Sequence, residues 1–495
     1  MSKLPALLRV NETTDYPVEQ NINTDILRPV AFNQKSSRFV FQKTGVLDAN
    51  SQLNLRMSVV DGTANSTKAF FPSHLGCLST IKEAFLQIGG KKVSTLSDLG
   101  HYSTYIRTHF SNDYRKGIAS VKQGGCDWFS GSTSASIQAG IKQQGFQAPY
   151  GQIGRDGSRV CIYQGTESNI AFNVGNFGLQ RDEVCNAKEE VKHRQLGRTA
   201  DTTPDFAVSL SQLVPLLRNF QIPLFLIKEE VSLTIIFTDD VVGDRYCVPA
   251  GLTGLSSTIH QEHFYLMVDY LFYPSQMALL TEEVMSGGGY DFGYTDIHTQ
   301  NNYLSFTGTG VEQKDYQIAM SGKKLKHIIV QKQADIPYGD GDFNSQGNYN
   351  SVAFRSGEEY QFQVESKNFY SRAISNYSMM KAEVDAVEGV PLHLSHYQYC
   401  YDGQVDNAGA NSNTGITERD YNGYEQELEC GFQNWIGVKM ENSFGVGRRL
   451  TTNLPIIFQQ KITKSGSDIQ SRKIRFFVGV QRVMNISNGR ITLIE

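Results

Sequence analysis

The feature that most constrains the fold is an alternation of apolar and polar residues with a period of two. Residues 53–59 read LNLRMSV, residues 231–238 read VSLTIIFT and residues 360–364 read YQFQV. Because successive side chains of a strand point to opposite faces, these segments are predicted to be strands with one buried and one wet face. Further runs rich in β-branched and aromatic residues predict additional strands at Arg38–Lys43, Phe264–Tyr273, His327–Val330, Ile456–Lys461 and Ile474–Met484. The chain is therefore expected to be all-β.

Helical patterns are few and short. Apolar residues recur every three or four positions over 97–110, where Ser97 is the expected N-cap. A second helix is predicted from about Ser211, because a proline at 215 is tolerated in a first turn. A third is predicted to begin at Pro274 and to end at the three glycines of 287–289.

The length fits two large β domains. The chain has 495 residues, and all-β domains often run to about 200–250 residues. With 40% hydrophobic residues, 28 Phe and 24 Tyr, it can bury a large core. The stretch 241–260 separates one strong strand from the next, so we predict an N-terminal arm over 1–35, a first domain over 36–250 and a second over 251–495.

Long insertions separate the predicted strands. Residues 111–160 are rich in Gly, Ser and Gln, and residues 335–352 and 401–425 are rich in Gly, Asn and Asp. Loops of this length without structure of their own are uncommon in compact domains, where they are usually functional or ordered by a partner. We therefore expect these insertions to contact other molecules.

Charge and cysteine usage exclude several classes of protein. Lys and Arg number 46 and Asp and Glu 50, a net charge of −4, and the first 35 residues are neutral overall. No basic field for nucleic acid or anionic lipid is expected. Seven cysteines without a CxxC pair indicate reduced thiols and a cytosol-like compartment of synthesis. No apolar run is long enough to span a membrane, so a soluble protein is predicted.

Glycine-rich candidates for a phosphate site are weak. Residues 89–92 read GGKK, but they lack the upstream glycine and the hydroxyl residue of a phosphate-binding loop. Residues 445–447 read GVG and precede two arginines, a pattern more typical of a turn. No cofactor-binding residue is predicted from either.

Candidate metal ligands are equally weak. His393 and His396 lie three residues apart with a cysteine at 400, but on a strand they would point to opposite faces. His260 and His263 have the same spacing and the same fault. The acidic stretch 340–351 begins like a calcium loop, but Ser345 and Ser351 occupy the positions that need Gly and Glu. We predict no metal site.

Candidate catalytic carboxylates also fail on geometry. Glu229 and Glu230 are neighbours on a predicted strand, so they face opposite ways and cannot flank one bond. The charged run 181–198 has helical spacing typical of a solvated helix face. No catalytic residue is predicted, and the chain is not expected to be an enzyme.

Four segments, in order along the chain, resemble one family of proteins. Residues 210–237 read LSQLVPLLRNFQIPLFLIKEEVSLTIIF, a short helix, an Arg-Asn turn and a strand entered through Ile-Pro-Leu. The other landmarks are the IGGK turn and helix of 77–110, YLMVDYLFYPSQMALL at 265–280, and IRFFVGVQRVMNISNGRITL at 474–493. Together they resemble the double jelly-roll major capsid proteins of polinton-like viruses and virophages. Phe220-Gln221 replaces the Pro-Gly of the giant-virus members, which are thus less similar.

The resemblance implies an architecture and a function. The fold would be two consecutive eight-stranded antiparallel jelly rolls with a few short helices and long tower loops. The protein would form homotrimeric, pseudo-hexagonal capsomers of an icosahedral double-stranded DNA virus. Its partners would be itself, a penton protein and minor or cement proteins, with no sequence-specific nucleic acid, and its place the virion. It would need no cofactor.

Two other functions remain open at this stage. A carbohydrate-binding or carbohydrate-cleaving β-sandwich protein would need an exposed aromatic platform or converging carboxylates. Only two tryptophans, Trp128 and Trp435, argue against such a platform, although 24 tyrosines leave the possibility open. A minor shell or scaffold protein of the same fold is the third interpretation.

Overall fold

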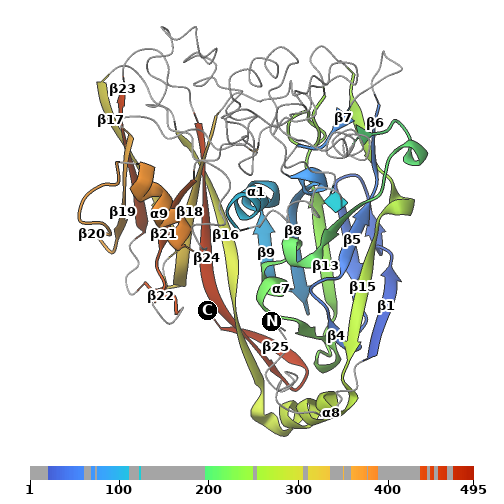
Figure 1. The fold of residues 1–495 in the computed structure, drawn as a ribbon. Helices are drawn as coiled ribbons and strands as arrows, with labels where there is room; N and C mark the ends of the chain where they lie inside the picture. Colours follow the sequence, from blue (N-terminus) through green and yellow to red (C-terminus); the bar gives the residue numbers. More distant parts are fainter. Residues whose placement is uncertain are drawn as a thin grey trace, which may run out of the picture.

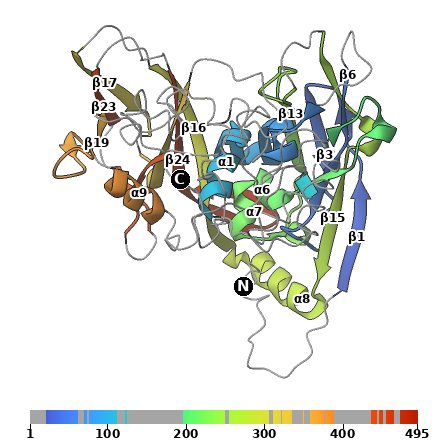
Figure 2. The ribbon, with the colours of Figure 1, turned by 45° about the horizontal axis from the view of Figure 1, so that its top comes forward.

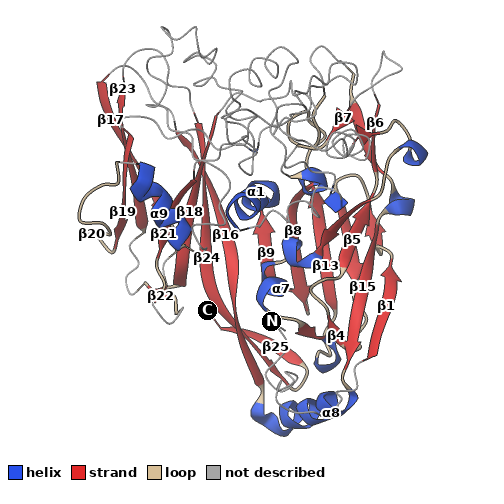
Figure 3. Ribbon diagram, in the orientation of Figure 1, coloured by secondary structure: helices blue, strands red, loops and turns tan. Residues whose placement is uncertain are grey.

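Strands dominate the structure, and the helices are few and short (Figure 3). The computed structural model describes residues 21–60, 69–72, 75–110, 122–123, 195–248, 254–304, 310–320, 322–334, 349, 358–375, 377–387, 435–442, 446–450, 455–464 and 472–494. Every predicted strand falls on an observed one. Period-two alternation and β-branched composition therefore identified the elements correctly.

Two sheets form a first sandwich. The first sheet has the order β11 (Phe206–Ser209), β5 (Gln52–Leu55), β15 (Tyr265–Phe272), β4 (Val46–Leu47) and β12 (Ile222–Pro223), with β1 (Asn21–Leu27) on the other side of β15. The second has the order β2 (Ala31–Phe32), β3 (Ser36–Val40), β13 (Val231–Phe237), β8 (Ile81–Ile88) and β9 (Lys91–Ser97). Phe264, which precedes β15, packs between them against Phe39 and Phe237. Two small ladders extend this sandwich, β10 (Gln195–Leu196) with β7 (Ala69–Phe70) and β14 (Ser256–Ile259) with β6 (Met57–Val60).

A second sandwich follows. One sheet has the order β16 (Tyr290–Leu304), β24 (Arg472–Ser487), β18 (Lys324–Ala334) and β21 (Trp435–Lys439), with β22 (Arg448–Arg449) on β18 and β25 (Arg490–Ile494) on β24. The other has the order β17 (Gly310–Ile318), β23 (Ile456–Lys464), β19 (Glu358–Val364) and β20 (Lys367–Asn368). Phe458 of the second sheet packs edge-on against Phe476 of the first, 5.6 Å apart between ring centroids.

The three predicted helices are present with small differences. The first is α1 (Leu99–Phe110), which begins two residues after Ser97 because Ser97 is still the last residue of β9. The second is split into α6 (Leu210–Leu213) and α7 (Pro215–Asn219), with the proline as the first residue of α7. The third is α8 (Pro274–Glu283), which continues as a π-helical turn over Val284–Gly288. One helix, α9 (Tyr377–Ala386), was not predicted.

The alternating segment 53–59 differs from the single strand that was predicted. It forms β5 and β6, which are interrupted at Arg56. β5 pairs with β11 and β15, whereas β6 pairs with β14. A change of pairing partners, which leaves no signal in the alternation, thus divides one regular pattern into two strands.

The two sandwiches lie side by side, and α8 crosses the base of the molecule from β15 to β16 (Figures 1 and 2). The strands β14 and β15 lie after residue 250, yet they pair with strands of the first sandwich. We propose that the boundary between the two domains lies at α8, not in 241–260. Within the predicted arm, residues 21–27 form β1 and pair along the whole length of β15.

Candidate functional site

The closest approach of the two sandwiches joins the edges of two sheets. β9 ends one sheet and β16 ends another, and an open edge carries unpaired backbone groups that need partners. Side chains of β16 provide three of them. The Tyr294 hydroxyl donates to the Val93 carbonyl, the Asp296 carboxylate accepts from Thr95 N at 3.1 Å, and Thr299 Oγ1 donates to the Ser97 carbonyl at 3.0 Å. These six residues, together with Ser94, Phe220, Phe292 and Arg482, are called the seam below.

Asp296 is the centre of the polar half of the seam. Its side chain is 1% exposed and its Oδ2 accepts a hydrogen bond of 2.7 Å from Arg482 Nη1, whose side chain is 11% exposed. Its Oδ1 also accepts from Ser94 Oγ at 3.1 Å. Burial raises the pKa of Asp296 to about 6, although Arg482 and the hydrogen bonds from Thr95 and Ser94 act in the opposite direction. Arg482 lies on β24, the neighbour of β16 in the same sheet, so this ion pair belongs to the second sandwich. The buried carboxylate that it fixes reaches the first sandwich through the hydrogen bonds from Ser94 and Thr95 of β9.

The apolar half of the seam is aromatic. The ring of Phe220, just after α7, stacks on Phe292 of β16 with centroids 3.8 Å apart and planes within 11°. Tyr102 of α1 contacts Phe477 of β24 at 5.3 Å between centroids. Such pairs add to the free energy of burying the rings themselves. Apolar packing and the hydrogen bonds of β16 side chains to β9 thus act on the same interface.

Tyr349 provides a further contact between the sandwiches. Its hydroxyl donates to the Asp244 carbonyl at 2.6 Å, and its own carbonyl accepts from Gln331 Nε2 at 3.0 Å. Its ring lies 4.7 Å from that of His101, and both side chains are buried. Burial raises the pKa of the Tyr349 hydroxyl and lowers the pKa of His101, so both are neutral at pH 7.

The base of the molecule has its own cross-links. Lys228 N donates to the Gly489 carbonyl at 2.9 Å, and Ile491 N donates to Glu229 Oε2 at 3.4 Å. Lys91 Nζ donates to the Ile491 carbonyl at 3.4 Å. The hairpin of β24 and β25 is therefore attached to the first sandwich.

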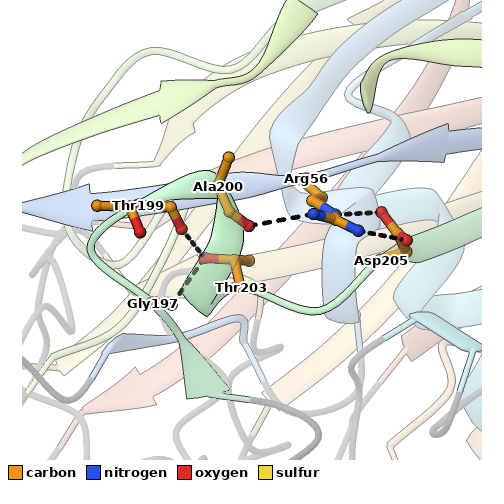
Figure 4. A network of polar contacts seen from close by, with 6 residues as sticks. All are labelled: Arg56, Gly197, Thr199, Ala200, Thr203 and Asp205. Carbon is orange, nitrogen blue, oxygen red and sulfur yellow. Dashed lines mark hydrogen bonds and ion pairs between the residues drawn. The ribbon is translucent and has the colours of Figure 1, made fainter. Parts of the chain in front are cut away.

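A second polar cluster lies at the other end of the first sandwich (Figure 4). Arg56 binds both carboxylate oxygens of Asp205, with Nη2 at 2.8 Å from Oδ2, and its Nη1 donates to the Ala200 carbonyl at 3.3 Å. The hydrogen bond from Arg56 lowers the pKa of Asp205, and the same bond raises the pKa of Arg56. This two-pronged geometry is the strong form of an Arg–carboxylate contact.

The segment that Arg56 binds is also tied to itself. Thr203 Oγ1 donates to the Thr199 carbonyl at 3.1 Å and accepts from Gly197 N at 2.9 Å. A Cβ at Gly197 would lie only 2.3 Å from Thr202 Oγ1 and 2.4 Å from its carbonyl oxygen. This turn, between β10 and β11, therefore requires glycine at 197.

The carboxylates and histidines that were considered as candidates from the sequence make contacts within the fold. Glu230 forms an exposed ion pair with Arg38, whereas Glu229 faces the base cross-links, so the two do point apart. His260 Nε2 lies 2.9 Å from Ser58 Oγ, and His263 lies in a short 3-10 turn. Burial, with the charges of His263 and Arg56, lowers the pKa of His260.

The glycine-rich candidate at 89–92 is a hairpin turn. Gly89 and Gly90 join β8 to β9 with φ of 57° and 80°, as a two-residue turn of this hand requires. Lys92 lies over the ring of Phe85 at 3.8 Å from its centroid. Gly447 N donates to Gln481 Oε1 at 2.9 Å.

Other candidates lie outside the described residues: the histidines and cysteine of 393–400, the acidic stretch of 340–344, residue 445, most of 181–198, the insertion 111–160 except residues 122–123, and the insertion 401–425. Among the residues that the structure describes, no group of three or more His, Cys, Asp or Glu side chains could hold a metal ion. Cys77 and Cys247 are buried. No helix in the described ranges is long and apolar enough to cross a membrane.

Sequence reasoning missed the seam residues. Asp296 follows Phe292 and Tyr294 at a spacing of two, so it occupies a position at which the strand pattern calls for an apolar side chain. A lone acid on the buried face of a long strand was the available signal. Its partner, Arg482, cannot be identified without the pairing of β16 with β24.

Comparisons with known proteins add to this geometry. No family model and no curated protein matches the sequence. Among solved structures, PBCV-1 VP54 fitted into a reconstruction of the virophage Sputnik matches with a TM-score of 0.56 and 10% identity, over 98% of this chain and 99% of that chain. The Faustovirus major capsid protein matches with a TM-score of 0.53 and 9% identity, over 97% of this chain and 93% of that chain. The mavirus major capsid protein matches with a TM-score of 0.50 and 10% identity, over 99% of this chain and 94% of that chain.

These similarities are similarities of fold, and they extend over nearly the whole chain. The chain has the all-β, double jelly-roll fold, as its sequence landmarks predicted. The neighbours include a virophage capsid protein, in agreement with the family that the four landmarks resemble.

Proposed function

We propose that the protein is a major capsid protein that assembles into homotrimeric, pseudo-hexagonal capsomers, which tile the icosahedral shell of a double-stranded DNA virus. The observation that carries the proposal is the seam. The hydrogen bonds from β9 to the buried Asp296 and the stack of Phe220 on Phe292 keep two sandwiches in one fixed arrangement. Three copies of such a two-lobed unit would present six similar lobes around a three-fold axis, and closed cyclic association satisfies an identical surface on every copy.

The fold comparison supports this function because proteins of the same architecture are named as major capsid proteins in their solved structures. Seven cysteines without a CxxC pair agree with a shell made in a reducing host compartment and held without disulfides. A penton protein and minor or cement proteins would complete the shell, and the protein would reside in the virion.

The test is the native mass of the purified full-length chain by light scattering, with negative-stain images of the same peak. A homotrimer has three times the chain mass of 55.3 kDa, or about 166 kDa, and should give hexagonal outlines. A stable monomer at high protein concentration would contradict the capsomer.

The carbohydrate-binding interpretation has less support. Trp435 is fully buried in β21 and cannot serve as a sugar platform. Glu229 and Glu230, the paired carboxylates, point apart. A monomer that binds immobilised glycans would nevertheless favour this function over assembly.

A further inference from the structure

β1 presents its apolar side to solvent. Ile22 and Ile26 are each 60% exposed, whereas Asn23 and Asp25 lie opposite the buried residues of β15, on the side that faces the sandwich. Directly opposed residues of a ladder share one face of the sheet. Leu27, on the sandwich-facing side, packs against the core as in an ordinary surface strand, but the outer side carries two exposed isoleucines where such a strand is usually polar.

The outer edge of β1 is also open. Within the described ranges, β1 pairs only with β15, and it lies on the side of the first sandwich away from the second in both views (Figures 1 and 2). Open edges are normally protected by charge, proline or bulges. β17, an edge strand of the second sandwich, carries such protection with Glu312, Lys314 and Asp315, whereas β1 has one charged residue, and Gln42 binds its carboxylate.

The sequence of β1 is self-complementary in antiparallel register. If two copies pair about Thr24, Ile22 of each copy lies opposite Ile26 of the other, and Asn23 lies opposite Asp25, so no like charges meet. Opposed apolar residues stabilise such a ladder, and opposed like charges destabilise it.

We propose that β1 pairs with β1 of a second copy of this chain about Thr24, which makes one continuous sheet across a two-fold axis. On its outer face, an apolar row would run from Met267 through Ile26 of one copy to Ile22 and Leu271 of the other. This row follows from the observed register, in which Ile26 lies opposite Met267 and Ile22 lies opposite Leu271.

The two-fold symmetry of this contact indicates which subunits of the assembly it would join. An isologous contact closes after two copies, whereas the proposed capsomer is built around a three-fold axis. The pairing of β1 strands would therefore join two neighbouring capsomers, and in this respect it rests on the proposed function. It would supply the contact between blocks that a shell needs in addition to the contacts within each block.

Cysteine cross-linking in the full-length chain tests the register. Thr24→Cys should give a disulfide-linked dimer of chains under mild oxidation of assembled protein, because directly opposed Cβ atoms lie about 4.5–5.5 Å apart. Ile22→Cys alone should give no linked dimer, because its opposite residue is at 26. An equal mixture of Ile22→Cys and Ile26→Cys chains should give one. Wild type, with its native cysteines, is the background control.

A second pair of variants tests the contact without cross-linking. Ile22→Lys should preserve the trimer mass and the melting temperature but weaken the association of trimers. The protein concentration at which sheets or shells form should rise at least tenfold. Val311→Lys, on the charged edge strand β17 at a site 63% exposed, is the matched control and should assemble like wild type.

The outcomes separate this inference from the proposed function. Trimers that assemble normally with Ile22→Lys, or that give no Thr24→Cys dimer, would overturn the β1 contact and leave the capsomer standing. A linked Ile22→Cys homodimer would overturn the register. A wild-type chain that never forms trimers would instead overturn the proposed function.

Discussion

Removal of the Phe220 ring should uncouple the two sandwiches. Phe220 is 6% exposed and stacks face to face on Phe292 across the seam. Phe→Ala in a buried site costs about 3–5 kcal/mol, and the loss of a stacked partner adds about 0.5–1.5 kcal/mol. Phe220→Ala should therefore lower the free energy of unfolding by about 4 kcal/mol, or roughly 10³ in the unfolding equilibrium constant.

The matched control is Phe237→Ala. Phe237 is 3% exposed and packs at 5.4 Å from Phe264 inside the first sandwich, away from the seam. Truncation of this side chain should lower the free energy of unfolding by a similar amount, about 3–5 kcal/mol. Only the seam variant, however, should change how the two halves unfold relative to each other.

Urea unfolding followed by two signals distinguishes a loss of coupling between the sandwiches from a general loss of stability. Trp435 lies in the second sandwich, so its fluorescence in a Trp128→Phe background reports on that half, while far-UV circular dichroism reports on all strands. The two curves should coincide in wild type and Phe237→Ala and separate in Phe220→Ala. Coincident curves in Phe220→Ala, or a loss below about 1 kcal/mol, would refute the reasoning that the seam couples the halves.

Three further outcomes are expected. Gly197→Ala should cost about 1–3 kcal/mol in chemical denaturation because its Cβ meets Thr202, whereas Gly293→Ala, whose nearest contact is 3.8 Å away, should be neutral within about 0.5 kcal/mol; equal effects would contradict the turn geometry. Because the folded-state pKa of Asp296 is raised to about 6, its ionised form opposes folding above that pH. The free energy of unfolding of wild type should therefore rise relative to Asp296→Asn by up to about 3 kcal/mol as the pH falls from 7 to 4, and a pH-independent difference would exclude the raised pKa. Phe476→Ala, at a fully buried site, should cost about 3–5 kcal/mol, and Tyr303→Ala, at a site 58% exposed, less than about 0.5 kcal/mol in the same assay.

Short-range physics made the elements predictable. A strand such as β13 shows its buried face in the sequence because alternate residues must be apolar, whatever its partners are. The helix from Pro274 was equally readable, because proline begins a helix and glycine ends one at little cost. The double jelly roll was expected for a different reason: the four landmarks resemble those of a known family, which carries the fold with it.

The boundary that we propose at α8 and the seam could not be predicted in this way. β15 lies in the second half of the sequence, but it completes a sheet of the first sandwich, and strand partners hundreds of residues apart leave no periodic signal. β1 lay inside a predicted arm because its two isoleucines face outward, against the usual pattern.

By itself, the amino-acid sequence determined the all-β class, the two-part organisation, the short helices and the absence of any familiar catalytic motif. Those properties depend on alternation, composition and turn residues, which act over a few positions. Only the tertiary structure decided that Asp296 meets Arg482 and that side chains of β16 bind the open backbone edge of β9. Such contacts join residues about 200 positions apart, and their free energy exists only after both sheets have formed and excluded water.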